Sequence, residues 1–151
     1  MKKILLLTTL IITIQLNAQR TPKAIFIIAD GIPADLIESL PMPNLHAITK
    51  SGGYTRAHVG GEKGGYSETP TISAVGYNSL LTGTWVNKHN VWDNDIAAPN
   101  YHYHNIFRML KEQFPQKTTA VISTWLDNRP KLVGSDSADA GHIMPEYYYD
   151  G

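Results

Sequence analysis

The strongest constraint on the fold is a short apolar run near the N-terminus that ends in an acidic residue. Residues 24–29 read A-I-F-I-I-A, and Asp30-Gly31 follow at once. The run does not alternate between apolar and polar residues, which is typical of a strand covered on both faces in a parallel sheet. We therefore predict a buried parallel strand at Ile25–Ala29. Asp30 would then stand at the carboxyl end of that strand, the edge of the sheet at which open α/β folds build their sites.

The rest of the chain combines predicted helices with a second strand. The predicted helices cover residues 34–40, 45–50, 73–82 and 105–114, and the predicted strand covers residues 118–123. In the second helix we expect Asn44 to be the N-cap and Leu45 and Ile48 to face inward. Residues 127–151 show no recognisable element. A helix followed closely by a strand favours a βαβ arrangement, so the predicted fold class is α/β, with a mostly parallel sheet flanked by helices.

The first residues are predicted to be a signal peptide rather than part of the fold. Lys2-Lys3 supply a positive start and residues 4–16 an apolar core, with cleavage expected after Ala18. This segment, residues 1–18, is shorter in its apolar part than the roughly 20 residues that span a membrane, so no stable membrane anchor is expected. The predicted location is the periplasm or the secreted space.

Composition narrows the range of partners. The 151 residues include 13 Lys and Arg and 13 Asp and Glu, which gives no net charge. A basic surface for nucleic-acid polymers is therefore not expected. The chain has no cysteine, which excludes disulfide bonds and a lipoprotein anchor.

Ser73 opens one of the predicted helices. A hydroxyl in the first turn lies near free backbone N–H groups and the positive end of the helix dipole, and both attract an anionic phosphoryl group. Serine is a weak nucleophile at neutral pH, and metal coordination through Asp and His is a natural means of activating it. Plainer interpretations are open for each residue by itself: Asp30-Gly31 as a turn, Ser73 as a helix cap and Asn94 as a turn residue.

Spacing joins these residues into one pattern. Residues 79–83 read S-L-L-T-G, and residues 89–94 read H-N-V-W-D-N. Both segments resemble the alkaline phosphatase superfamily, in which a Ser/Thr-Leu-x-Thr-Gly signature ends the helix that the nucleophile begins. Counting back from Gly83 by the family interval reaches Ser73 rather than the threonines before it. The interval from Ser73 to Asn94 resembles that to the phosphate-binding Asn of the type I phosphodiesterase/nucleotide pyrophosphatase branch.

The resemblance implies an alkaline-phosphatase-like fold and a metal-dependent hydrolase of phosphate esters, with residues 19–151 as the N-terminal part of its domain. It implies that Asp30 and Ser73 are metal ligands, that Ser73 is the nucleophile that forms a phospho-enzyme, and that Asn94 binds the substrate phosphate. It also implies two divalent metal ions, Zn²⁺ being the expected metal, and a small phosphate-ester or nucleotide substrate.

The neighbours of Ser73 depart from the branch pattern. The branch usually has Thr at the nucleophile followed by Phe-Pro-Asn-His, whereas residues 74–77 read A-V-G-Y. A sulfatase would have Pro and Arg where Val75 and Tyr77 stand, and an alkaline phosphatase proper would have Asp where Ile72 stands. Nucleotide specificity is therefore open, and a phosphomonoesterase or a phosphonate hydrolase of the same superfamily is an alternative.

The other metal ligands of the superfamily are an Asp…His pair, an Asp-His dipeptide and a late His, a pattern that the six histidines of this chain do not supply. His102 and His104 alternate as strand residues do, but a polar loop is the preferred interpretation. We therefore expect the N-terminal part of a longer enzyme. The alternative is a truncated, catalytically incomplete protein that keeps the first half of the fold. A reading frame that continues past Gly151 into Asp-x-x-x-His and Asp-His motifs would favour the enzyme.

Overall fold

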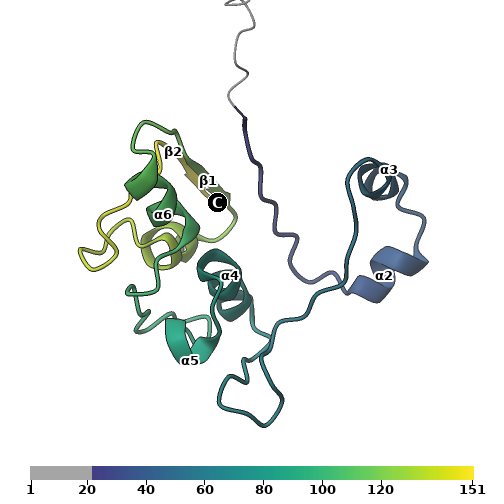
Figure 1. Ribbon diagram of the computed structural model, residues 1–151, viewed down its shortest axis with the longest axis horizontal. Helices are drawn as coiled ribbons and strands as arrows, with labels where there is room; N and C mark the ends of the chain where they lie inside the picture. The colour runs from purple at the N-terminus through teal and green to yellow at the C-terminus, as the bar shows by residue number, and fades with distance from the viewer. Residues whose placement is uncertain (1–21) are drawn as a thin grey trace, which may run out of the picture.

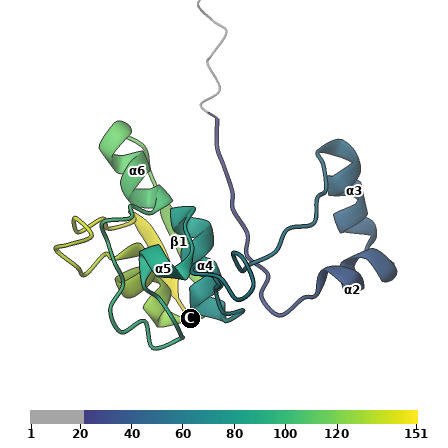
Figure 2. The ribbon, with the colours of Figure 1, turned by 60° about the horizontal axis from the view of Figure 1, so that its bottom comes forward.

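The computed structural model describes residues 22–151, so the predicted signal peptide lies outside the described residues. The described chain has a body and an arm, which lie on opposite sides of the extended segment that precedes α2 (Figures 1 and 2). The arm contains α2 (Ala34–Ser39) and α3 (Pro43–Ser51), and the body contains α4 (Ser73–Thr82), α5 (Val86–His89), α6 (Ile106–Gln113) and the strands. Helices and a parallel sheet occur together, which confirms the predicted α/β class in this general sense.

The sheet has two parallel strands. Strand β1 (Ala120–Ser123) lies beside β2 (Tyr147–Asp150), with Ala120 opposite Tyr147. The prediction of a strand at residues 118–123 is confirmed, with a start two residues later. The prediction that residues 127–151 contain no element is wrong. Those residues form β2 and, before it, the short helices η1 (Leu126–Asn128) and η2 (Arg129–Val133). The three consecutive tyrosines of β2 suit a strand because aromatic side chains are favoured there.

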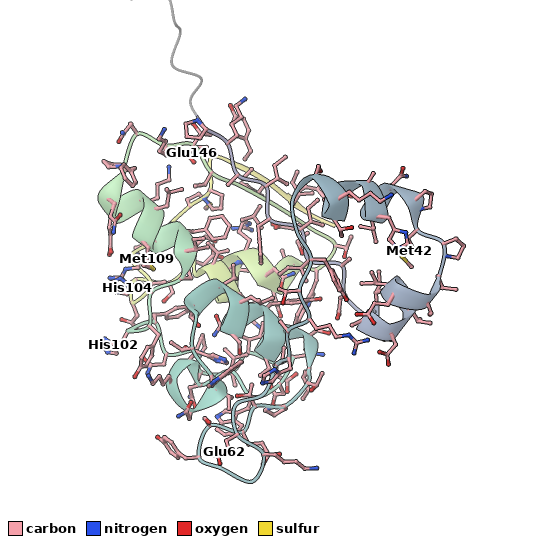
Figure 3. The ribbon with its side chains drawn as sticks, turned by 45° about the vertical axis from the view of Figure 1, so that its right-hand side comes forward. Met42, Glu62, His102, His104, Met109 and Glu146 are labelled. Atoms are coloured by element: carbon pink, nitrogen blue, oxygen red, sulfur yellow. The ribbon has the colours of Figure 1, made fainter. Side chains whose placement is uncertain are left out.

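Charged side chains fasten β2 to the rest of the body. Glu146, just before β2 (Figure 3), accepts hydrogen bonds from the Thr119 backbone N–H at 2.8 Å and the Thr119 hydroxyl at 3.0 Å. It also forms an ion pair with Lys111 of α6. Farther along, the Arg129 Nε donates to Asp150 Oδ2 at 2.8 Å. These contacts join segments that are distant in sequence, which explains why local patterns did not reveal β2.

The core of the body forms around α4. Its members are aliphatic side chains from α4, α5, η2 and the loop after α5: Ala74, Val75, Val86, Val91, Ile96 and Leu132. Tyr77, Leu81 and Trp125 pack against this core while partly exposed. Because α4 contributes a fully buried Ala74 and Val75 directly after Ser73, the start of this helix is held in place by packing.

Two of the predicted helices are confirmed nearly to the residue. Helix α4 begins at Ser73 and ends at Thr82, and its C-cap Gly83 adopts a φ of 66°, as C-terminal glycines commonly do. Helix α6 has Asn105 as its N-cap, with the Asn105 side chain accepting from the Arg108 N–H at 3.0 Å. The Asn105 amide also donates to the Val133 carbonyl at 2.9 Å, which ties α6 to η2.

The predicted strand at Ile25–Ala29 is wrong for this structure. Residues 22–29 are extended but belong to no sheet, and Ile25 and Ile27 are 87% and 80% exposed. Apolar residues favour a strand only where a neighbouring strand pairs with it and a layer covers it. Within residues 22–151 the only sheet is the β1–β2 pair, and this segment does not join it.

The arm also differs in detail from the prediction. Helix α3 begins at Pro43, after an N-cap at Met42, so Asn44 is inside the helix rather than its cap. Proline suits this position because the first helical residue needs no N–H donor. Leu45 and Ile48 are exposed rather than inward-facing. Neither α2 nor α3 contains a buried residue.

A buried histidine lies between α4 and the residues after α5. His89 is fully buried; its Nδ1 accepts from the Val91 N–H at 3.1 Å, so its Nε2 carries the proton. That proton is directed to the Ser79 hydroxyl at 2.9 Å, and the hydroxyl in turn donates to the Val75 carbonyl at 2.8 Å. Burial lowers the pKa of His89 to about 4. Because His89 is the donor to Ser79, this pair supports the fold and does not activate the serine.

We expect stability to fall as the pH drops from about 6.5 towards 4. His89 titrates near 6.5 when unfolded and near 4 when folded, so folding favours its neutral form, and that stabilisation is lost as protons bind. The full shift corresponds to roughly 3 kcal/mol in the free energy of unfolding. The contacts of Glu38 with Arg56 and of Glu146 with Lys111 lower both glutamate pKa values from 4.5 to about 2. Their contribution to stability is therefore lost only at lower pH. Urea denaturation at several pH values would measure this loss.

Replacing His89 with glutamine should flatten the dependence between pH 4.5 and 6.5, whereas His46→Gln, at an exposed position of α3, should leave it. A wild-type free energy of unfolding that stays constant over that range would contradict the assignment.

Among the helices of residues 22–151, none is long and apolar enough to cross a bilayer.

Candidate active site

The structure brings Asp30 and Ser73 together. Asp30 follows the extended segment, Ser73 is the first residue of α4, and the Ser73 hydroxyl donates to Asp30 Oδ2 at 2.8 Å. The contact is solvent-exposed, so an external ligand can reach it. The N-cap of α4 is Ile72, and no side chain of that residue caps the helix. Ser73 is therefore not the helix cap that the plainer interpretation suggested.

Tyr77 approaches the same carboxylate. Its hydroxyl donates to Asp30 Oδ2 at 2.8 Å, and the Gly31 N–H donates to Asp30 Oδ1 at 2.8 Å. The hydrogen bond from Ser73, followed by that from Tyr77, lowers the pKa of Asp30. Burial, with the Asp30 contact second, raises the pKa of Tyr77. Asp30 is thus held as a carboxylate and Tyr77 as a hydroxyl donor. From the sequence, Tyr77 was treated only as a departure from the family motif, although its position four residues after Ser73 puts both side chains on one face of the helix.

Asn94 reaches the start of α4 from a loop 20 residues farther along. Its Oδ1 accepts from the Ala74 N–H at 3.1 Å, so it fills the role that a capping side chain at Ile72 would otherwise have. Within residues 22–151 its amide N–H₂ group makes no hydrogen bond, and the side chain is exposed. Asn94 therefore lies beside Ser73 with two donors available.

The three site residues predicted from the sequence thus lie together at the N-terminal end of α4. Asp30 contributes carboxylate oxygens, Ser73 a hydroxyl, and Asn94 amide donors, next to the positive end of a ten-residue helix. Such an arrangement suits an anionic ligand, and a phosphoryl group is the common example at a helix N-terminus. The catalytic, substrate-binding and metal roles of these residues stay predictions.

The fit to a metal ion is partial. Asp30 Oδ2 and Ser73 Oγ are two adjacent, exposed oxygen donors, as a divalent cation requires. Within residues 22–151, however, no group of three or more His, Cys, Asp or Glu side chains is placed to hold a metal. His102 and His104 lie at the outer surface near α6 (Figure 3), where His104 Nδ1 is 3.2 Å from Glu112 Oε2. They belong to a polar loop, the interpretation that the sequence favoured.

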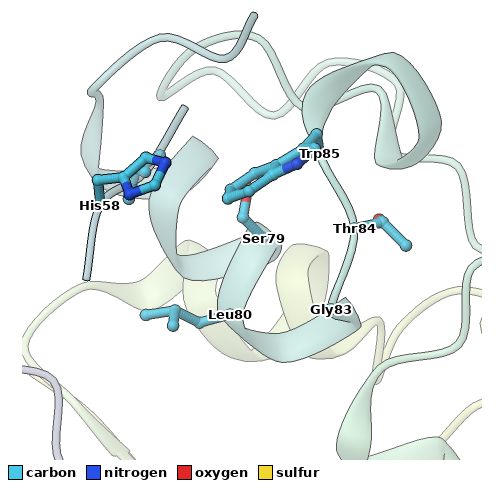
Figure 4. Close-up of a pocket in the computed structure, with 7 residues that line it drawn as sticks. His58, Ser79, Leu80, Gly83, Thr84 and Trp85 are labelled. Carbon is cyan, nitrogen blue, oxygen red and sulfur yellow. The ribbon is translucent and has the colours of Figure 1, made fainter. Parts of the chain in front are cut away.

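A cavity of about 190 Å³ occurs at the other end of α4. It is lined by residues of α4, of the turn after it and of an earlier loop: His58, Val59, Ser79, Leu80, Gly83, Thr84 and Trp85 (Figure 4). Gly83 is ten residues beyond Ser73, which is ~15 Å along a helix axis. This cavity is therefore separate from the Asp30–Ser73 contact.

Comparison with known protein families finds a match that includes these residues. The sequence model of the type I phosphodiesterase / nucleotide pyrophosphatase family matches residues 24–145, most of the 151-residue chain. The chain belongs to this family. No curated protein and no solved structure matches the chain. The match begins at the segment before Asp30 and includes Ser73, Tyr77 and Asn94, so the whole candidate site lies in the part shared with other phosphodiesterase family members. Members of this family are generally metal-dependent and act on phosphate esters.

Proposed function

We propose that this phosphodiesterase family member hydrolyses phosphate esters by covalent catalysis at Ser73. The observation that carries the proposal is the Ser73–Asp30 contact at the start of α4, with the free amide of Asn94 beside it. A nucleophile, a metal-binding carboxylate and an anion-binding donor are the parts that phosphoryl transfer needs in one place.

The reaction would proceed in two displacements. The Ser73 hydroxyl loses its proton to solvent, its oxygen attacks phosphorus to form a new O–P bond, and the bond to the leaving group breaks, with that group taking up a proton from solvent. Water then displaces Ser73 from phosphorus and regenerates the hydroxyl. During both steps Asn94 donates to a phosphoryl oxygen, and the N-terminus of α4 stabilises the same negative charge.

Asp30 and Ser73 would hold one divalent cation through their oxygen atoms. We propose two Zn²⁺ ions per site, the second bound by ligands outside this pair; a bound zinc ion lowers the pKa of a coordinated hydroxyl and neutralises phosphoryl charge. The substrate proposed is a small phosphate ester or nucleotide. The N-terminal sequence supports a periplasmic or secreted location.

The direct assay is hydrolysis by the intact gene product that carries this sequence. Bis(p-nitrophenyl) phosphate, p-nitrophenyl phosphate and p-nitrophenyl phenylphosphonate separate diesterase, monoesterase and phosphonate hydrolase activity. We expect the diester to be preferred, EDTA to abolish turnover and Zn²⁺ to restore it. Absence of metal-dependent hydrolysis with all three esters would instead support the catalytically incomplete alternative.

We expect Asn94→Ala to lower kcat/KM by ~10²-fold, because one donor to the transition-state charge is lost. The variant should also lose about 1 kcal/mol of stability, since the Ala74 N–H loses its acceptor. Steady-state kinetics and urea denaturation measure the two effects.

Asn94→Asp separates them, because aspartate keeps the acceptor for Ala74 and replaces the amide donors. It should retain stability and lose at least as much activity as the alanine variant. Full activity in Asn94→Asp would contradict a role in phosphate binding.

A further inference from the structure

Tyr77 contributes the second hydrogen bond to the oxygen of Asp30 that Ser73 also contacts. Both hydroxyls are 2.8 Å from Asp30 Oδ2, while the Gly31 N–H occupies Oδ1. The carboxylate is therefore held by three donors. Two of them come from α4, and the third comes from its own backbone segment.

The two donors on α4 are fixed by the helix. Tyr77 follows Ser73 by four residues, so the two side chains share one face of α4. The Tyr77 ring packs against the core that contains Ala74 and Val75, which limits the movement of its hydroxyl. Asp30, in contrast, follows residues 22–29, which are exposed and belong to no sheet. The position of Asp30 thus depends on the hydrogen bonds that Ser73 and Tyr77 of α4 donate to it.

The two contacts differ in what happens to them during phosphoryl transfer. Once the Ser73 oxygen bonds phosphorus, its hydroxyl proton is gone and it no longer donates to Asp30. Tyr77 is not a nucleophile in this reaction, so its hydrogen bond to Oδ2 persists. It is then the remaining side-chain hydrogen bond from α4 to the carboxylate.

We propose that Tyr77 is a positioning residue that holds Asp30 against Ser73 throughout the reaction. The inference rests on the proposed function for its catalytic consequence, but the hold itself is a property of the fold. Tyr77→Phe removes the hydroxyl and keeps the ring that packs against the core, so the helix should remain folded, as circular dichroism would show.

The effect of Tyr77 on the position of Asp30 relative to α4 can be measured without metal or substrate. The chain has no cysteine, so Ile27→Cys and Leu80→Cys, both at exposed positions, place one spin label on the segment before Asp30 and one on α4. We expect a single narrow distance distribution in the parent and a broad one with Tyr77→Phe added. Tyr66→Phe, in the loop before α4 and 88% exposed, is the matched control and should leave the distribution narrow.

The catalytic consequence concerns the metal requirement. In the intact gene product, Tyr77→Phe should raise the Zn²⁺ concentration for half-maximal hydrolysis by ~10–100-fold, the usual effect of losing a group that orients a metal ligand. Excess Zn²⁺ should restore kcat to near the parent value, which a general loss of folding would not allow.

Failure of the two claims can be told apart. Hydrolysis that persists in Ser73→Ala would overturn the proposed function, while a broadened distribution would still support the hold by Tyr77. A folded Tyr77→Phe chain with an unchanged distance distribution would overturn the positioning role, whatever the activity.

Discussion

Replacing Ser73 with alanine is expected to lower the rate of phosphate-ester hydrolysis almost to the uncatalysed rate. The covalent step depends on the Ser73 oxygen, which is the proposed nucleophile. The fold should survive, because Ser73 does not cap α4 and the core begins with Ala74. Initial rates with a chromogenic phosphodiester, together with a urea denaturation curve, measure both parts.

Ser51→Ala is a matched control for this change. Ser51 is an exposed serine at the end of α3, where its hydroxyl donates to the Ile48 carbonyl and has no other hydrogen-bond partner within residues 22–151. It should leave the rate unchanged. Comparable rates in Ser73→Ala and the parent would exclude Ser73 as the nucleophile.

Replacement of Asp30 with asparagine is expected to have the next largest effect. Asparagine has nearly the same shape but lacks the negative charge that a divalent cation requires from a carboxylate ligand. The affinity for Zn²⁺ should fall by more than ~100-fold, since losing a residue that merely orients a ligand already costs ~10–100-fold. Hydrolysis should fall with it at any practical Zn²⁺ concentration. Zinc titrations of activity and competition with a chromogenic chelator provide the two measurements.

Asp35→Asn, in the exposed first turn of α2, controls for the removal of a negative charge. Its carboxylate pairs with Arg56 in the arm rather than with the site. It should leave zinc affinity unchanged. Equal zinc affinity in Asp30→Asn and the parent would mean that Asp30 is not a ligand.

Local patterns predicted the parts of the fold that local chemistry determines. Helix α4 could be located from the spacing between Ser73 and Gly83, and α6 from its apolar period and the proline after it. The proximity of Asp30, Ser73 and Asn94 also followed from sequence, although through family spacing rather than through any property of the separate residues. The structure adds the distances between these residues and their hydrogen-bond partners.

Long-range contacts determine what the sequence did not reveal. Residues 25–29 have strand-forming side chains, but a strand also needs a partner, and sequence alone does not show whether one is adjacent. Strand β2 depends on pairing with β1 and on Glu146, neither of which is visible within residues 147–150. Tyr77 was treated only as a departure from a motif, although its helical spacing from Ser73 placed it on the face of α4 that meets Asp30.

Trapping the covalent intermediate tests the central claim most directly. The intact gene product would react with bis(p-nitrophenyl) phosphate in the presence of Zn²⁺, be quenched in acid within one turnover, and be digested for mass spectrometry. Covalent catalysis at Ser73 predicts a phosphoryl adduct on its side chain that appears with the first release of p-nitrophenol and is absent from Ser73→Ala. An adduct on a different residue, or rapid hydrolysis without an adduct at any quench time, would contradict it.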